Sequence, residues 1–211
     1  MERKVSWPLY LTAFVISAII FIAGIYVGTI LDSAEINTLS SNVDSLSKEI
    51  STVQVLMLSE AGSAFCPVYE EEFLKIDAER EKVGYELTYL EEERNVYSPE
   101  LKKDYFVLEA QSYFLAKKLQ DVCNNDTILV LYFYSNEDCE DCARQGIDIL
   151  SARDASSENI LIYSFDGNLG STMAEGFMTE YNVTTYPSIV INGETHSGYM
   201  SQEELAAEFS K

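Results

Sequence analysis

Residues 7–31 form an unbroken run without a charged side chain, WPLYLTAFVISAIIFIAGIYVGTIL. About twenty apolar residues are enough for a helix to cross the hydrocarbon core of a bilayer, so a run of this length can span it with some tilt. Arg3 and Lys4 precede the run, and Asp32 and Glu35 follow it. Because basic flanks stay on the cytoplasmic side, we expect a single-pass cell-membrane protein with a cytoplasmic N-terminus and an extracytoplasmic C-terminal domain.

A cleaved signal peptide is the alternative interpretation of this segment. Signal peptides have apolar regions of roughly 7–15 residues followed by a small-x-small cleavage site. Here the apolar run is longer and no convincing site follows it. We therefore predict an uncleaved N-terminal membrane anchor over residues 1–31.

The chain is strongly acidic, with 35 Asp and Glu against 14 Lys and Arg and a formal net charge of −21 over 211 residues. A nucleic-acid-binding protein needs a basic patch to neutralise phosphates, and none is visible. Nucleic acid is therefore not expected as a partner. The 47% hydrophobic content is that of a folded protein and not of a disordered one.

A heptad pattern covers residues 32–60, where branched and long apolar residues alternate at spacings of three and four. Its members are Ile36, Leu39, Val43, Leu46, Ile50, Val53 and Met57. Branched residues at position a with leucine at d favour a parallel two-stranded coiled coil, which would make this segment the stalk of a homodimer. A single amphipathic helix packed on the protein's own body fits the same pattern, and three heptads do not distinguish the two.

Residues 61–125 have a helical and strongly charged pattern that predicts an antiparallel hairpin of two long helices. The helices are joined near 96–98, where Ser98 can cap the second helix and Pro99 suits its first position. The acidic groups at 70–72 and 91–93 are expected to form a solvated face.

The hairpin brings two of the four cysteines together. Cys66 lies 31 residues before Tyr97 and Cys123 lies 26 residues after it, so two helical arms of similar length would place both at the open end. Disulfides persist outside the cytoplasm. A bridge here would restrict the unfolded chain and thereby raise the free energy of unfolding by roughly 4 kcal/mol. We favour a structural disulfide over two buried free thiols.

The remaining residues, 126–211, change to short apolar runs that alternate with helical patterns. Residues 127–135 (TILVLYFYS) and 159–166 (NILIYSFD) are typical of strands buried on both faces. A helix is expected from Cys139 to about Ala152 and another over 171–182, then a hairpin turning at Asn192-Gly193 and a last helix capped by Ser201 and Glu204. The predicted order is strand, helix, strand, helix, strand, strand, helix, which defines an α/β domain with an antiparallel edge.

This segment resembles the thioredoxin superfamily over residues 127–209. A C-x-x-C (NEDCEDCARQG) stands where a buried strand passes into a helix, and YNVTTYPSIVING resembles the family's segment in which a cis proline precedes a strand. The expected fold class is therefore α/β: a thioredoxin-like βαβαββα domain preceded by a transmembrane helix, a heptad helix and an antiparallel helical hairpin.

The resemblance implies thiol–disulfide exchange. It assigns Cys139 as the attacking thiol and Cys142 as the resolving thiol, and it assigns Pro187 with the backbone of Tyr186 to substrate docking. The chemistry suits these positions, because a thiolate at the start of a helix is favoured by unpaired N–H groups and the helix dipole. The implied function is a membrane-anchored oxidoreductase acting on protein disulfides, with protein thiol or disulfide substrates, an unidentified redox partner and no cofactor.

Some residues depart from the family's pattern. Asp138 replaces the familiar Trp before the first cysteine, Glu140 and Asp141 replace Gly-Pro or Pro-His between the thiols, and Phe133 replaces a buried Asp. Carboxylates raise the cost of a nearby anion. The hypothesis is that the Cys139 thiol is less acidic than in the strong oxidants of the family, so that the protein is a modest oxidant, an isomerase or a reductase.

Two other functions fit the same residues. Zinc needs four ligands, usually thiolate or imidazole, and His196 is the single histidine that could join Cys139 and Cys142, so no metal site is expected. A non-catalytic thioredoxin-like scaffold, in which the C-x-x-C is a plain structural disulfide, is the alternative to the enzyme.

Overall fold

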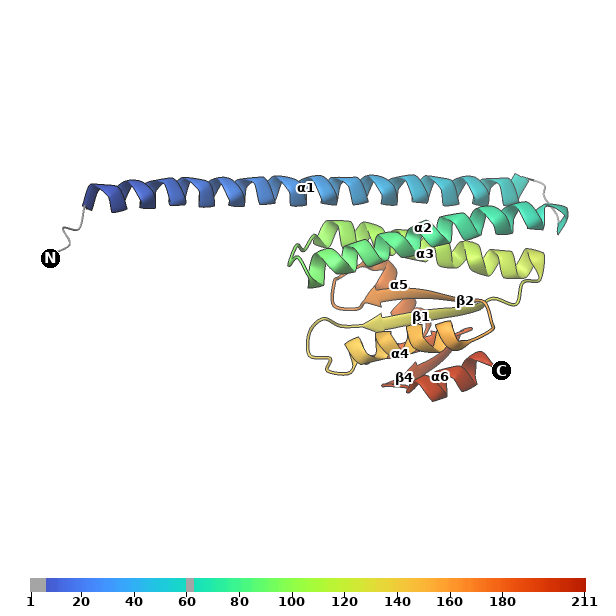
Figure 1. The fold of residues 1–211 in the computed structure, drawn as a ribbon. Helices are drawn as coiled ribbons and strands as arrows, with labels where there is room; N and C mark the ends of the chain where they lie inside the picture. The colour runs from blue at the N-terminus through green and yellow to red at the C-terminus, as the bar shows by residue number, and fades with distance from the viewer. Residues whose placement is uncertain (1–6, 60–62) are drawn as a thin grey trace.

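The computed structural model describes residues 7–59 and 63–211 (Figure 1). The N-terminal part is helical, with α1 (Trp7–Ser59), a short 3-10 turn (Ser63–Phe65), α2 (Cys66–Glu92) and α3 (Pro99–Cys123). The C-terminal part contains β1 (Ile128–Tyr134), α4 (Cys142–Ala155), β2 (Ile160–Asp166), α5 (Thr172–Glu180), β3 (Ser188–Ile191), β4 (Glu194–Ser197) and α6 (Gln202–Phe209). The chain is thus mostly helical with one small mixed sheet.

The expected anchor and the expected stalk are one continuous helix, α1. Its first half carries exposed apolar side chains such as Phe14, Phe21 and Tyr26, and it projects beyond the rest of the chain (Figure 1). Within the described residues, α1 is the helix that is long and apolar enough to cross a membrane.

The heptad residues of α1 lie in the protein's own core. Leu39, Val43, Leu46, Ile50 and Val53 are all buried, and α1 packs against both α2 and α3. The seam is therefore covered by the helical hairpin, which is the intramolecular alternative among the two interpretations of the heptads. A homodimer through the same seam would have to displace the hairpin.

The helical hairpin forms as the sequence predicts. The Ser98 hydroxyl accepts a hydrogen bond from the Leu101 N–H at 3.4 Å, and Pro99 occupies the first turn of α3. Cys66 begins α2 and Cys123 ends α3, and the two are joined by a disulfide with a Cα–Cα distance of 5.5 Å. The disulfide expected from the similar lengths of the two arms is therefore present.

The sheet has the strand order β2-β1-β3-β4. β1 and β2 are parallel, whereas β1–β3 and β3–β4 are antiparallel. The turn between β3 and β4 is at Asn192-Gly193, where both residues have positive φ, as the favoured hairpin dipeptide requires. The seven elements after residue 126 follow the order that the sequence predicts.

Both faces of the sheet are covered by helices. On one face, Leu129, Leu131 and Phe133 of β1 join a core that includes α1, α2, α3 and α5. On the other face, Val130 and Tyr132 pack with residues of α4 and α6. The hairpin therefore lies between α1 and the sheet, and β1 is buried on both sides, as its continuous apolar run predicts.

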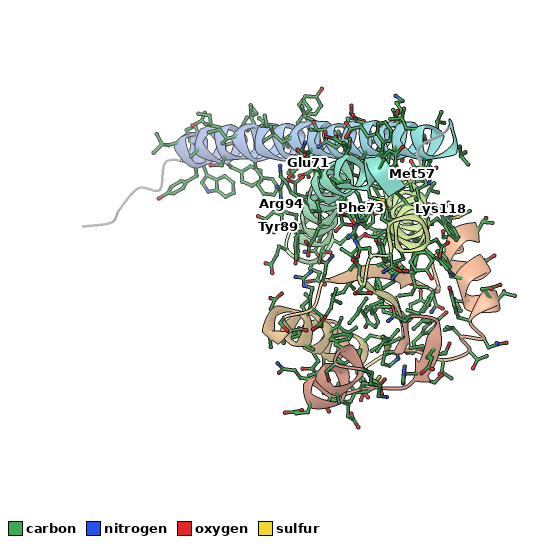
Figure 2. All side chains as sticks on the ribbon, turned by 90° about the vertical axis from the view of Figure 1, so that its right-hand side faces the viewer. Met57, Glu71, Phe73, Tyr89, Arg94 and Lys118 are labelled. Atoms are coloured by element: carbon green, nitrogen blue, oxygen red, sulfur yellow. A yellow bond between two sulfur atoms is a disulfide. The ribbon has the colours of Figure 1, made fainter. Side chains whose placement is uncertain are left out.

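A buried ionic cluster joins α2 to α3 beneath the sheet. The Arg80 guanidinium donates to Asp77 at 2.8 Å and to Glu109 at 2.7 Å, and Tyr105 donates to Glu109. The same guanidinium lies 4.7 Å from the ring centroid of Tyr163 on β2. Figure 2 shows how densely side chains fill the space between the hairpin and the sheet.

The expectation of a fully solvated acidic face on the hairpin is only partly right. Glu71 and Glu72 are exposed and pair with Lys75. Glu91, by contrast, is half-buried and accepts a hydrogen bond from the buried Lys102 ammonium at 2.8 Å. Glu91 is drawn out of solvent by a tertiary contact, because the buried Lys102 on the opposite arm of the hairpin needs a counter-charge.

Candidate functional site

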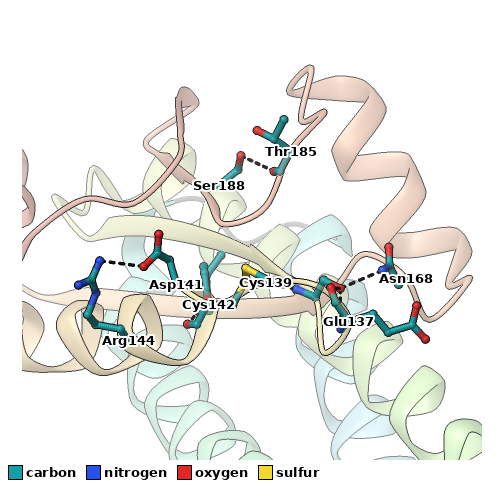
Figure 3. Close-up of a disulfide and its surroundings, with 10 residues drawn as sticks. Glu137, Cys139, Asp141, Cys142, Arg144, Asn168, Thr185 and Ser188 are labelled. Carbon is teal, nitrogen blue, oxygen red and sulfur yellow. Dashed lines mark hydrogen bonds and ion pairs between the residues drawn. A yellow bond between two sulfur atoms is a disulfide. The ribbon is translucent and has the colours of Figure 1, made fainter.

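The C-x-x-C cysteines lie in the connection between the central strand β1 and helix α4 (Figure 3). They form a disulfide with a Cα–Cα distance of 5.4 Å. Cys139 is half-buried, whereas Cys142 is buried, with 5% of its surface exposed. Cys139 is therefore the more accessible residue of the pair.

The helix starts later than the sequence predicts. α4 begins at Cys142 and not at Cys139, because residues 139–141 form a turn and Asp138 has a left-handed backbone with a φ of 50°. Aspartate tolerates this conformation better than most residues. Cys139 consequently precedes the first helical turn, and the Cys142 N–H donates to its carbonyl at 3.4 Å.

The buried sulfur is held by the backbone of the strand end. The Ser135 N–H donates to Cys142 Sγ at 3.5 Å, and the Tyr132 hydroxyl donates to the Cys142 carbonyl at 2.6 Å. Ser135 Oγ in turn accepts from the Asn168 side-chain amide at 2.9 Å. These contacts of Ser135, Tyr132 and Asn168 were not expected from the sequence, although the residues lie at or near the ends of the two parallel strands, where sites commonly form.

The segment 185–188 approaches the same strand end from β3. The Tyr186–Pro187 peptide bond is cis, Pro187 is buried, and Ser188 pairs with Phe133 of β1. Continuing this antiparallel register places Pro187 level with Tyr134, one residue before Ser135, which contacts the Cys142 sulfur. Figure 3 shows Thr185 and Ser188 in the surroundings of the disulfide.

The Tyr186 side chain packs against Gly167, just after β2, and against Met178 of α5. A Cβ added at Gly167 would lie 2.0 Å from the Tyr186 hydroxyl oxygen, and that hydroxyl is 3.5 Å from Met178 Sδ. Burial raises the pKa of the Tyr186 phenol, with a smaller contribution from Asp166. The ring therefore packs the 185–187 loop against the end of β2.

Carboxylates surround Cys139, and the nearest arginine is already engaged. Arg144 donates to Asp141 at 2.8 Å and lies 3.8 Å from the ring centroid of Tyr199. Figure 3 shows the Arg144 side chain directed toward Asp141. Asp138 and Glu140 are exposed and have no such partner among the ion pairs of the described residues. The charge around the turn is therefore negative.

An acidic cleft of about 720 Å³ lies beside the dithiol turn. It runs between the tip of the helical hairpin and the carboxyl ends of β1 and β2. Its lining residues are Glu91, Glu92, Asn95, Tyr97, Pro99, Asn136, Glu137, Asp166, Asn168 and Leu169. Burial raises the pKa of the Tyr97 phenol, and the negative charge of Glu91 adds to this shift.

The structure places the other candidate residues away from this turn. The Cys66–Cys123 bridge lies at the open end of the hairpin, far along α2 and α3 from the tip that lines the cleft. His196 is on β4, paired with Ile189. Among residues 7–59 and 63–211, no group of three or more His, Cys, Asp and Glu side chains is arranged to hold a metal ion.

Comparisons with known proteins add little to this geometry. No family model and no curated protein matches the chain. It is weakly similar to a solved structure described as "Structure of a malarial protein", with 19% sequence identity and a TM-score of 0.34. The match covers 40% of this chain and 96% of that one. A score this low carries no functional conclusion.

Proposed function

We propose that this protein is a membrane-anchored, extracytoplasmic thiol–disulfide oxidoreductase with a thioredoxin-like C-terminal domain. Cys139 would attack or be attacked, Cys142 would resolve, and Pro187 with the backbone of Tyr186 would dock the substrate chain. One observation carries the proposal: Cys139, which is only partly buried, is bridged to the buried Cys142 at the end of the central strand, level with a cis-proline segment.

The reaction follows from the oxidised state of the pair. A substrate thiolate attacks Cys139 Sγ, the Cys139–Cys142 bond breaks, and Cys142 leaves as a thiolate next to the Ser135 N–H. A second substrate thiolate then attacks the mixed disulfide at the substrate sulfur. The substrate gains a disulfide, Cys139 leaves with the electron pair, and the protein is reduced by two electrons. The reverse sequence reduces a substrate disulfide.

The surroundings of the pair support a modest oxidant. A backbone N–H that donates to the Cys142 sulfur favours its thiolate, which helps it to act as the leaving group. The carboxylates of Asp138 and Glu140 oppose a thiolate at Cys139, and Arg144 is committed to Asp141. A less stable Cys139 thiolate makes the reduced form less favoured, so the disulfide is comparatively stable.

Single-cysteine variants test the proposal. Reduced Cys142→Ser is expected to form a long-lived mixed disulfide with a soluble pyridyl disulfide or with scrambled ribonuclease, because Cys139 can attack but nothing can resolve the adduct. Cys139→Ser is expected to form far less adduct, because the remaining sulfur is buried. Wild-type chain should catalyse insulin reduction in the presence of a dithiol reductant.

The scaffold alternative makes the opposite prediction for the same variants. If the bridge is merely structural, both substitutions should lower stability, neither should accumulate a mixed disulfide, and wild-type chain should be inactive with insulin. Insulin reduction that persists in Cys139→Ser would remove the dithiol from the reaction.

A further inference from the structure

We infer that the dithiol faces the membrane surface, and that its exchange partner is a disulfide or dithiol in a juxtamembrane loop of an integral membrane protein. This inference rests on the proposed function for its chemistry. Its geometry depends on the placement of three parts of the chain: the apolar half of α1, the tip of the hairpin and the turn that carries Cys139.

The first step is the rigid connection between the apolar segment and the folded body. α1 runs without interruption from Trp7 to Ser59, and its buried residues from Leu39 to Val53 lie in the same core as the hairpin and one face of the sheet. A helix rises about 1.5 Å per residue, so the distance of the body from the apolar segment is fixed by the helix.

The second step is the position of the hairpin tip. Arg94, which lies in the link between α2 and α3, forms ion pairs with Asp32 and, at 3.3 Å, with Glu35. Asp32 is the first charged residue after the apolar run, and Glu35 lies within one helical turn of it. If residues 7–31 span the bilayer, the hairpin tip therefore lies at the membrane boundary.

The hairpin tip lies close to the turn that carries Cys139. Glu91 and Tyr97 of the tip line the same acidic cleft as Asn136 and Glu137 of the turn after β1. Cys139 follows Glu137 by two residues, which limits their separation to about 7 Å of extended chain. The cysteine turn is thus at the end of the body that faces the bilayer.

The arrangement of the strands agrees with this placement. Figure 1 shows the end of β1, the loop that leads to α4 and the tip of the hairpin on one side of the body. The apolar half of α1 projects toward the same side. The amino ends of the parallel strands β1 and β2 and the Cys66–Cys123 bridge lie at the opposite end.

The charge of the cleft indicates a protein partner and not the lipid itself. Glu91, Glu92, Glu137 and Asp166 line it, while the nearby cations Lys102 and Arg94 are already paired with carboxylates. Anionic headgroups would be repelled by such a surface. A polypeptide loop that carries basic side chains beside its cysteine would bind, because its charge is complementary to that of the cleft.

A lipid-tethered disulfide tests the inference. Full-length chain is reconstituted into phosphatidylcholine vesicles and reduced, and phosphatidylethanolamine whose headgroup carries a pyridyl disulfide is then inserted into the same bilayers. Exchange releases pyridinethione, which is followed by absorbance. A soluble pyridyl disulfide is the reference substrate. We expect the ratio of the lipid-tethered rate to the soluble rate to depend on the height of the body above the bilayer.

The height is changed by inserting seven helix-forming residues, Glu-Ala-Ala-Ala-Lys-Ala-Gln, between Leu31 and Asp32. The insertion lifts the body by about 10 Å and rotates it by only about 20°, so Asp32 and Glu35 keep their pairs with Arg94. Exchange with the lipid-tethered disulfide should fall by about tenfold or more, since a sulfur out of reach has almost no effective concentration. Exchange with the soluble disulfide should not change.

A second measurement reports the geometry without the exchange reaction. In Cys142→Ser, the Cys139 thiol should be alkylated by a headgroup maleimide, whereas a thiol introduced by Glu158→Cys in a chain lacking Cys139 and Cys142 should not. Glu158 is exposed and lies just before β2, at the opposite end of the strands. Soluble maleimide should label both variants.

The outcomes separate the two proposals. If soluble disulfide exchanges at the same rate in wild-type and lifted chains but the lipid-tethered rate is also unchanged, the membrane-facing site is wrong. The same conclusion follows if Glu158→Cys is alkylated by the lipid maleimide as fast as Cys139. If neither disulfide exchanges although maleimide labelling follows the expected pattern, the geometry stands and the proposed oxidoreductase function is wrong.

Discussion

Replacing Arg80 by methionine should lower the free energy of unfolding by about 3–5 kcal/mol at neutral pH, because it leaves buried carboxylates without their counter-charge. Arg80 is 4% exposed and Glu109 is 2% exposed, and the guanidinium donates to Asp77 at 2.8 Å and to Glu109 at 2.7 Å. Methionine retains much of the side chain's apolar volume, so the loss is mainly electrostatic. For a chain of this size the corresponding decrease in Tm is roughly 6–20 °C.

The loss should depend on pH, and its sign follows from Glu109. Burial raises the pKa of the Glu109 carboxyl, while the charge of Arg80 opposes that shift. A carboxyl whose folded-state pKa is raised contributes stability below its unfolded pKa and loses that contribution as pH rises through the folded pKa. Removing Arg80 raises the folded pKa further, so the destabilisation should be smaller near pH 4 than near pH 7.5, because the usual glutamate pKa of about 4.3 lies between the two.

The assay is urea unfolding of full-length chain in detergent micelles at both pH values. Near-ultraviolet circular dichroism of the tyrosines is the signal, because the single tryptophan, Trp7, lies in the apolar half of α1. Lys75→Met is the matched control, since it removes exposed ion pairs from the same helix and should have little effect. Arg80→Met/Glu109→Gln should recover part of the loss. A decrease below about 1 kcal/mol at neutral pH, or an equal decrease at both pH values, would refute the reasoning.

Three further predictions concern the cysteine turn and the α1 seam. Asp138→Asn keeps a residue that tolerates the left-handed backbone but removes a carboxylate beside Cys139, so alkylation against pH should give a lower Cys139 pKa; an unchanged value would contradict the role of these carboxylates. Gly167→Ala should slow disulfide exchange by displacing Tyr186, and adding Tyr186→Ala should restore part of the rate; failure of this rescue would contradict the coupling. Ile50→Ala should cost about 2–5 kcal/mol in urea unfolding without changing the sedimentation mass, whereas loss of a dimer would support a stalk.

The turns, the helix caps and the Cys66–Cys123 pairing were predicted correctly because each depends on backbone preferences or helix geometry within one or two elements. The hairpin link at Ser98-Pro99, the turn at Asn192-Gly193 and the capping box of α6 depend on residues within a few positions of one another. The Cys66–Cys123 pairing followed from the similar lengths of two helical arms and from the expected location outside the cytoplasm. Such features are fixed by backbone preference and helix rise, and both can be derived from a short stretch of sequence.

Longer-range features could not be predicted in the same way. The Arg80–Asp77 pair has helical spacing, but Glu109 lies 29 residues from Arg80 and its burial depends on how α2 meets α3. The heptads of α1 fit a partner chain and the protein's own hairpin equally well, since both present apolar ridges. The start of α4 moved to Cys142 because Asp138 adopts a left-handed backbone, which no periodicity reveals.

The continuous core from α1 to the sheet fixes the position of the N-terminal helix relative to the turn that carries Cys139. One cluster of buried side chains includes Leu39 of α1, Leu108 of α3 and Phe165 of β2, so the helix, the hairpin and the sheet share apolar contacts. A flexible tether would let the cysteine turn sample many heights above the bilayer, whereas moving this helix independently would expose several buried residues, each at a cost of about 1.5–3 kcal/mol. If residues 7–31 span a bilayer as proposed, α1 holds Cys139 at a fixed height above it, and the proposed exchange partner would have to present its sulfur at that height.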